Sequence, residues 1–343
     1  MPNLIGKKTI EGWEIVEALA LPPDHTGGYF SECYFVERGS DKAFLKLIDI
    51  SQIKDFAQLF QGLAELRYET QLVQASTNKR LSRVVRLLES GELEVDPTNP
   101  TPILQKLPYL VFERGQGDIR DTVDVSKSVL DKWRLCVLHR AASGLLQLHQ
   151  ANIAHQDIKP SNVIRIADDE LKIGDLGRSS QRGNAAPTDN YEIAGAFTYA
   201  PFELRYSYIL PDWVRRRLAT DVFHVGCLVV YVFTNIILPI HVLDRLAPPF
   251  QPSVWGDPYP QVIPQIKEAL EKSLSEIAGD FPVEFREELV SIVRDMCNPD
   301  PEKRGIGQGP RSSAGTSLWL QKFVSRFDIM EKRANIVARH RNA

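Results

Sequence analysis

Apolar and polar side chains alternate along much of the first third of the chain, a pattern that predicts short strands. We expect these strands at residues 13–19, 33–36, 43–48, 84–88 and 109–112. Residues 56–76 instead carry apolar side chains at helical spacing, and the proline-rich and asparagine-containing residues 95–100 are typical of an exposed loop. The pattern therefore predicts a small, mainly antiparallel lobe with one helix.

From about residue 130 the apolar positions recur at steps of three and four, which indicates helices. The predicted helices cover residues 130–148, 222–243, 265–277, 284–297 and, after a flexible link at 305–315, a last helix around 320–327. Residues 178–199 are polar and rich in glycine, serine and asparagine, so we expect a mobile loop there. The fold class is therefore α+β with two lobes, residues 1–113 and 114–309, followed by a C-terminal helix and basic tail at 310–343.

Two short apolar runs, residues 163–166 and 171–174, predict a hairpin with a four-residue turn. Pairing residue 166 with residue 171 would place Asn162 opposite Asp175, so an amide oxygen and a carboxylate would converge. Hard cations such as Mg²⁺ prefer oxygen ligands of this kind. The hairpin therefore predicts a metal site formed by Asn162 and Asp175.

Two charged residues precede the hairpin on the loop that enters it. Asp157 would lie beside the metal and could accept a proton, and Lys159 adds a positive charge. His155-Gln156-Asp157, with Asn162 five residues later and Asp175-Leu176-Gly177 on the return strand, resembles the catalytic and metal-binding loops of eukaryotic-type protein kinases. An aspartate after a histidine is weak evidence alone, because such residues are usually solvated; the joint spacing carries the resemblance.

The first lobe holds further residues that the resemblance assigns to nucleotide binding. Residues 26–31 resemble the family's glycine-rich loop, with Gly27, Gly28 and Ser31 near the phosphates, although Thr26 and Ser31 replace two of its glycines. Lys46 corresponds to the lysine that binds the α- and β-phosphates. Such a lysine requires a carboxylate partner: Glu69 fits best and Glu65 is the alternative. Read without the family, Lys46 is a solvent-side strand residue and both glutamates are solvated helix charges.

The resemblance extends to the adenine pocket and to residues that stabilise the second lobe. Phe112 would close the back of the pocket, and Glu113 would lie at the hinge that meets the base. Ala200-Pro201-Phe202-Glu203 is similar to the segment that ends the family's activation loop, where Arg304 would neutralise the buried glutamate. Asp221 would brace the backbone of the catalytic loop.

By resemblance, the protein binds ATP and Mg²⁺ and transfers phosphate to a serine or threonine hydroxyl of a protein substrate. Lys159 resembles the serine/threonine subgroup, whereas Ala196 stands where those kinases usually carry threonine. Gln156 replaces an arginine that in many relatives binds a phosphorylated activation-loop residue, a contact that a neutral amide cannot make. We therefore predict that activity does not depend on phosphorylation of Ser179, Ser180, Thr188 or Tyr191.

The amino-acid composition indicates which partners and which cellular compartment to expect. The 343 residues include 43% hydrophobic and 25% charged residues, with a net charge of −3, which is ordinary for a soluble globular protein and gives no reason to expect nucleic acid as a partner. The four dispersed cysteines favour a reducing cytoplasm. The apolar run 222–243 is long enough to span a membrane, but it contains His224, Asn235 and Pro239, so we expect a buried helix and no membrane partner.

Two other functions remain open on sequence grounds. One is a pseudokinase that binds a nucleotide or a partner and transfers nothing, which the altered glycine-rich loop favours. The other is a small-molecule phosphotransferase of the aminoglycoside-kinase type, against which Glu203, Asp221 and Arg304 argue.

Overall fold

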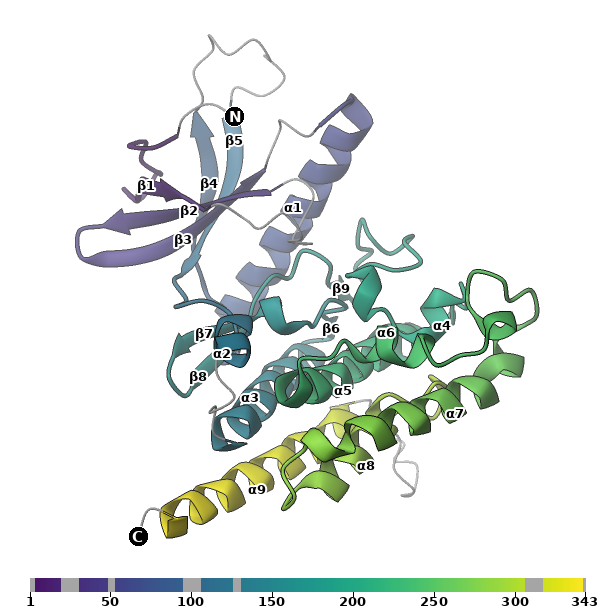
Figure 1. Ribbon diagram of the computed structural model, residues 1–343. Helices are drawn as coiled ribbons and strands as arrows, with labels where there is room; N and C mark the ends of the chain where they lie inside the picture. Colours follow the sequence, from purple (N-terminus) through teal and green to yellow (C-terminus); the bar gives the residue numbers. More distant parts are fainter. Residues whose placement is uncertain are drawn as a thin grey trace. The chain divides into compact units, whose positions relative to one another are not determined.

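A computed structural model describes residues 4–19, 31–48, 53–94, 106–125, 131–305 and 317–341. It divides into two compact units, a first unit of residues Met1–Gln116 and a second unit of residues Gly117–Ala343 (Figure 1). Along the sequence, the boundary between the two units lies three residues beyond the predicted lobe boundary at 113, and the last helix belongs to the second unit. The predicted loop at 95–100 and most of the predicted link at 305–315 lie outside the described residues.

The first unit is built on an antiparallel five-stranded sheet with the strand order β1-β2-β3-β5-β4. Its strands are β1 Glu14–Ala18, β2 Ser31–Arg38, β3 Asp41–Ile48, β4 Leu87–Glu94 and β5 Lys106–Glu113. In the central strand β3, Ala43, Leu45 and Leu47 are fully buried on one face. Because side chains alternate along a strand, Lys46 points to the opposite face.

One long helix, α1 Phe56–Asn78, accompanies this sheet and contacts β3 and β4. It begins at Asp55, whose Oδ1 accepts a hydrogen bond from the Gln58 backbone N–H at 2.8 Å and so caps the first turn. Leu66, Leu72 and Val73 bury one side of the helix. The same side carries Glu69, which is therefore buried despite its charge.

The fourth strand lies later in the chain than residues 84–88, where the apolar pattern predicted it. The prediction was wrong because β4 contains three glutamates and Gly91, so its sequence lacks the pattern of apolar side chains that indicates a strand. Glu89 is nevertheless buried and accepts hydrogen bonds from Thr9 Oγ1 at 2.8 Å and from the Tyr109 hydroxyl. A Cβ at Gly91 would lie 2.6 Å from that hydroxyl, so glycine is required for Tyr109 to reach Glu89.

The second unit is mainly helical, with two short two-stranded ribbons, β6 with β9 and β7 with β8. Its elements are α2 Arg120–Val125, α3 Asp131–Gln150, β6 Ile153–Ala154, β7 Val163–Ala167, β8 Glu170–Ile173, β9 Ser180–Gln181, α4 Phe202–Arg205, α5 Ala219–Thr234, α6 Leu238–Leu243, α7 Tyr259–Ile277, α8 Arg286–Met296 and α9 Ser317–Arg341. Every residue of α5 from Ala219 to Phe233 is buried, which makes α5 the core helix of this unit.

The apolar run 222–243 forms two helices and not the single one predicted. Asn235 ends α5 in a left-handed conformation with φ of 58°, which asparagine tolerates, and Pro239 lies in the first turn of α6. The continuous helix Val214–Thr234 is long and apolar enough to cross a membrane, yet 89% of its most apolar window is buried inside the protein. Its apolar surface is thus already covered by protein.

Helix α7 also differs from the sequence prediction. Helix α7 begins at Tyr259, six residues before the predicted start, because buried Val262 and Ile266 pack into the core although Pro264 interrupts the backbone hydrogen bonding.

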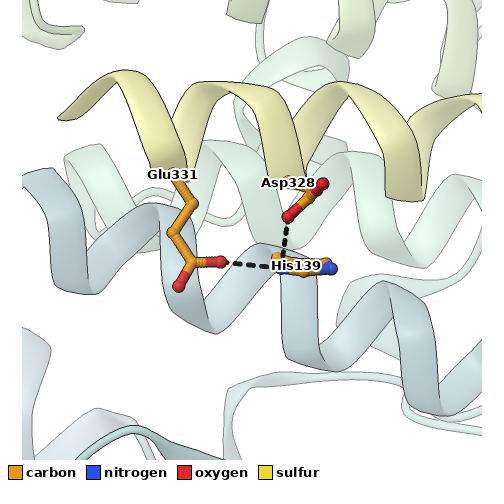
Figure 2. A group of neighbouring side chains, drawn as sticks. All are labelled: His139, Asp328 and Glu331. Atoms are coloured by element: carbon orange, nitrogen blue, oxygen red, sulfur yellow. Dashed lines mark hydrogen bonds and ion pairs between the residues drawn. The ribbon is translucent and has the colours of Figure 1, made fainter. Parts of the chain in front are cut away.

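Helix α9 lies along α3, where Glu331 accepts hydrogen bonds from Arg140 and lies 2.6 Å from His139 Nδ1 (Figure 2). Asp328, 3.9 Å from His139, completes this group. Because the Arg140 guanidinium already neutralises Glu331, the group is an ion-pair network between two helices.

Candidate active site

The first unit contributes an ion pair between β3 and α1. Lys46 Nζ donates to Oε1 and Oε2 of Glu69, each at 2.9 Å, and the two side chains are only 13% and 4% exposed. Glu65, the alternative partner, instead accepts a hydrogen bond from Gln61 one turn earlier. Two largely desolvated charges are tolerated because each satisfies the other. The pair therefore fixes an ammonium group on the sheet face.

The other residues predicted in the first unit are less fully defined. Gly27 and Gly28 lie outside the described residues, and Ser31 begins β2 opposite Ile48. Glu113 ends β5, and its backbone N–H donates to the Arg86 carbonyl oxygen at 3.0 Å. That N–H is therefore not available to a nucleotide base, so a contact from Glu113 to the base would need a different atom.

In the second unit, the loop from His155 to Asn162 is hydrogen bonded to the side chain of Asp221. The Asp221 carboxylate accepts hydrogen bonds from the backbone N–H groups of His155 at 2.8 Å and Gln156 at 2.6 Å, and lies 2.8 Å from His149 Nε2. Two successive N–H groups can face one carboxylate because Gln156 takes a left-handed conformation, with φ of 65°. Asp221 thus braces the loop as predicted.

The charge of Asp221 is held in place by these contacts. Burial by itself would raise the pKa of this fully buried carboxyl, but the hydrogen bond and charge of His149, together with the Gln156 N–H, lower the pKa below its ordinary value. The loop is therefore tied to a carboxylate that stays ionised at neutral pH.

Asp157 is the centre of the loop and only 4% exposed. Its Oδ2 accepts hydrogen bonds from Lys159 Nζ at 2.8 Å and Asn162 Nδ2 at 3.2 Å, and its Oδ1 accepts one from the Ala196 backbone N–H at 2.7 Å. His155 holds the turn, because its Nδ1 accepts from the Asp157 N–H and its Nε2 lies 2.9 Å from the Gly174 carbonyl oxygen. The structure thus brings Asp157, Lys159 and Asn162 together around one carboxylate.

The hairpin register differs by one residue from the prediction. Residue 171 pairs with Arg165 and not with residue 166, because Ile166 forms a bulge and the turn contains only Asp168 and Asp169. Asn162 consequently lies opposite Gly174, whose N–H donates to the Asn162 carbonyl oxygen at 2.9 Å. Asp175 follows directly, in a left-handed conformation with φ of 59°, which aspartate tolerates better than most residues.

The oxygen atoms at this end of the hairpin suit a magnesium ion. Asn162 Nδ2 also donates to the Asp157 carbonyl oxygen at 2.7 Å, so the amide is oriented and its Oδ1 is directed away from Asp157. Asp175 adds a carboxylate that is not fully buried. An oriented amide oxygen and a carboxylate are the ligand types that Mg²⁺ takes from proteins, and the remaining positions would be filled by water or phosphate.

A second buried ion pair stabilises the same unit. Arg304 is fully buried and donates from Nη1 and Nη2 to the two carboxylate oxygens of Glu203, at 2.7 and 2.6 Å. Its Nε donates to the Asn298 carbonyl oxygen at 3.0 Å, and its guanidinium lies 4.9 Å from the Phe223 ring centroid. This is the pairing predicted from the sequence, and its place in the core gives it a structural role.

Sequence reasoning missed the contacts that hold residues 178–201 against the catalytic loop. Residues 178–199, predicted to be a mobile loop, are packed: Ser179, Ser180 and Thr188 are at most 2% exposed. A Cβ at Gly195 would lie 2.7 Å from Asp157 Oδ1, so only glycine allows this close approach. Arg217, outside the segment, also contacts it at Asp189, and the run of arginines at 215–217 is the sequence signal that could have indicated this contact.

Comparison with known proteins agrees with this geometry. The family described as "Protein kinase domain" matches residues 27–307. The chain is 28% identical over 190 residues to Mitogen-activated protein kinase 8 of Arabidopsis thaliana, covering 52% of this chain and 30% of that protein. It is 27% identical over 234 residues to Mitogen-activated protein kinase p38b of Drosophila melanogaster, covering 65% of this chain and 56% of that protein. The chain thus spans between about a third and somewhat over half of the curated relatives it matches.

Proposed function

This chain belongs to the protein kinase family, and from that premise we propose that it transfers the γ-phosphoryl group of ATP to a serine or threonine hydroxyl of a protein substrate. The observation that carries the proposal is the bonding of Lys159 and Asn162 to one oxygen of the buried Asp157 carboxylate. Phosphoryl transfer asks a protein mainly for positioning and charge neutralisation, and these three side chains supply both.

In this mechanism Asp157 orients the acceptor hydroxyl and takes its proton as the new oxygen–phosphorus bond forms and the bond to the ADP oxygen breaks. Oδ2 accepts hydrogen bonds from Lys159 and Asn162, whereas within the described residues Oδ1 accepts one hydrogen bond, from Ala196. A carboxylate oxygen has two acceptor positions, so one position on Oδ1 remains for the hydroxyl. Lys159 also places a positive charge beside the transferred group.

The remaining predicted residues would bind the nucleotide and its metal ion. Asn162 and Asp175 would hold Mg²⁺, which when bound neutralises the charge of the phosphates. The ammonium of Lys46, fixed by Glu69, would bind the α- and β-phosphates. The backbone around Gly27, Gly28 and Ser31 would enclose the phosphates, and Glu113 would lie at the hinge near the base. The preference for serine and threonine rests on Lys159.

The test is phosphate transfer by the purified protein from γ-labelled ATP, with Mg²⁺ and a generic protein acceptor. We expect labelled protein with the unchanged chain. In the Asp157→Asn variant, transfer should fall by roughly 10²- to 10⁴-fold, because the amide cannot take the proton, while binding of a fluorescent ATP analogue persists. Transfer at the original rate in Asp157→Asn would remove Asp157 from this role.

A pseudokinase is the second candidate, and two observations favour it. The Asp157 carboxylate is nearly buried with both oxygens hydrogen bonded, and Thr26 and Ser31 depart from the family's glycine-rich loop. In the same assay a pseudokinase would bind the fluorescent ATP analogue but would transfer no labelled phosphate to the protein acceptor. Transfer to an aminoglycoside but to no protein would instead indicate a small-molecule phosphotransferase, which the Glu203–Arg304 pair argues against.

We also propose a cytoplasmic location. Cys136, Cys227 and Cys297 are buried and form no disulfide within the described residues. Proteins that keep several unpaired cysteines are typical of reducing compartments. Fractionation of cells that express the tagged protein tests this proposal.

A further inference from the structure

Arg217 connects the segment at residues 178–201 to the catalytic loop. It lies in the π-helical turn Val214–Leu218 that precedes α5, and its side chain is only 4% exposed. Its Nη1 donates to the Gln156 Oε1, and its Nη2 donates to Asp189 Oδ1 at 3.0 Å and to the Asp189 carbonyl oxygen at 2.9 Å. One guanidinium therefore joins the residue next to Asp157 to a carboxylate 33 positions further along the chain.

The Asp189 carboxylate is a centre of converging donors. Besides Arg217, it accepts hydrogen bonds from Ser180 Oγ at 2.9 Å and from the Ala186 backbone N–H at 2.8 Å. Ser180 in turn accepts from Trp213 Nε1 at 3.0 Å and pairs with Ala154 in the β6–β9 ribbon. A carboxylate with three donors, one of them charged, holds its surroundings more strongly than neutral hydrogen bonds do.

The same segment is fixed at its other end, beside the reacting carboxylate. The Ala196 N–H donates to Asp157 Oδ1, and Arg205 donates to the Phe197 carbonyl oxygen at 2.7 Å. Between the two ends, Arg216 donates to the Tyr191 carbonyl oxygen at 2.8 Å. Gln156 also donates from Nε2 to the Arg178 carbonyl oxygen at 3.2 Å. The segment is thus attached at several separate points along its length, and Asp189 and Ala196 are two of them.

We infer that Asp189 and Arg217 are positioning residues that hold the 178–201 segment in its active arrangement without phosphorylation, a conclusion that rests on the proposed kinase function. Asp189 supplies a negative charge within the segment, and Arg217 supplies the cation that binds it directly. The same guanidinium also binds the Gln156 amide oxygen in the catalytic loop. A phosphate on Ser180 would be placed against this carboxylate, which the Ser180 Oγ contacts, and like charges repel; Thr188 is the residue next to Asp189 in the chain. Both side chains are also buried.

The test compares Asp189→Asn, which removes the charge but keeps the shape, with Asp189→Glu, which keeps the charge. We expect Asp189→Asn to lower kcat for a protein acceptor by roughly tenfold or more with the KM for ATP unchanged, and Asp189→Glu to recover a large part of it. Glu271→Gln, in the exposed pair with Arg294, is the matched control and should leave kcat unchanged. Phosphatase treatment of the unchanged protein should have no effect.

The contact is also tested by a coupling measurement. If Asp189 acts through Arg217, the double variant Asp189→Asn with Arg217→Gln should be no less active than the worse single variant, because both changes remove the same interaction. Additive losses, an unchanged kcat in Asp189→Asn, or loss of activity after phosphatase treatment would each overturn the inference.

A readout that does not need activity separates this inference from the proposed function. Arg182 is exposed within the segment, so trypsin cleavage after Arg182 reports how firmly the segment is held. Cleavage should be faster in Asp189→Asn than in Glu271→Gln. If no variant transfers phosphate, the proposed function fails while the cleavage rates still decide the contact; equal rates in the two variants would overturn it.

Discussion

At the residue scale, the site depends on which of two equivalent side chains a helix presents to the sheet. Glu65 and Glu69 are one turn apart on α1 and face the same side by spacing. Glu69 is buried and binds Lys46, whereas Glu65 is half-buried and accepts a hydrogen bond from Gln61. The Asp55 cap and the packing of Leu66, Leu72 and Val73 fix where α1 lies along β3. The helical period alone leaves both choices open.

This difference gives a prediction with a built-in control. Glu69→Gln should lower kcat/KM for ATP by on the order of 10- to 100-fold, since a charge-assisted contact to Lys46 is lost and the ammonium is no longer oriented. Glu65→Gln changes the same chemical group one turn away and should stay close to the original value. Steady-state kinetics at varied ATP measures both variants, and equal losses would show that the pairing with Glu69 does not matter.

A second prediction at this scale concerns pH. Burial lowers the pKa of His224 to about 4, and the nearby Asp221 and Asp157 offset this only in part. The unfolded chain binds a proton at this histidine below about pH 6.5 whereas the folded protein does not, so stability is complete above that pH and falls toward pH 4. This group should cost on the order of 2 to 3 kcal/mol between pH 7 and pH 4.5.

Urea unfolding at several pH values measures this effect. In His224→Leu the acid-dependent loss should be smaller by that amount, whatever the absolute stability of the variant. The same slope in both proteins would contradict the neutral state of the buried histidine. Asp221 adds a loss of stability only at lower pH, because its pKa is depressed below the ordinary range of a carboxyl.

At the element scale, one bulge decides the geometry at the end of the hairpin. The polar turn and the two apolar runs correctly indicate strands at β7 and β8, but the extra residue at Ile166 leaves no mark in an alternating pattern. The register therefore shifts by one, Asn162 lies opposite Gly174, and the left-handed conformation of Asp175 then turns the chain.

The buried pair that joins α4 to the region after α8 gives the element-scale prediction. Arg304→Met should destabilise the protein by about 3 to 5 kcal/mol, because the Glu203 carboxylate would remain buried without its partner. Adding Glu203→Gln to that variant should recover a large part of the loss, since no uncompensated charge then remains. Chemical unfolding measures both. Lys303→Met, at an exposed lysine that pairs with Asp300, is the control and should leave the free energy of unfolding nearly unchanged.

At the scale of the whole molecule, the chain forms two compact units of different character, a sheet unit that carries Lys46 and Glu69 and a helical unit that carries Asp157 and the hairpin. The proposed activity depends on ATP and Mg²⁺, and a ligand that binds only the folded protein shifts the folding equilibrium toward it. Binding of Mg²⁺ and ATP should therefore stabilise the molecule, by about 2.7 kcal/mol when the free ligand is a hundred times its dissociation constant.

Thermal unfolding with and without ligand tests this expectation. The melting temperature should rise with ATP and Mg²⁺ together, and EDTA should remove most of the rise because Asn162 and Asp175 then hold no cation. Asp175→Asn should lose the magnesium-dependent part and keep the part that ATP produces alone. A rise that is insensitive to EDTA in the unchanged protein would argue against a metal at these residues.

The sequence by itself determined the family, the two-part fold class, the pairing of Arg304 with Glu203 and the bracing of the catalytic loop by Asp221, because short motifs and local periodicity carry that information. Tertiary structure decided between Glu65 and Glu69, shifted the hairpin register and linked Arg217 to Asp189. Each of these depends on packing or on contacts between residues distant along the chain, and hydrophobic periodicity describes only neighbours within a turn or a strand.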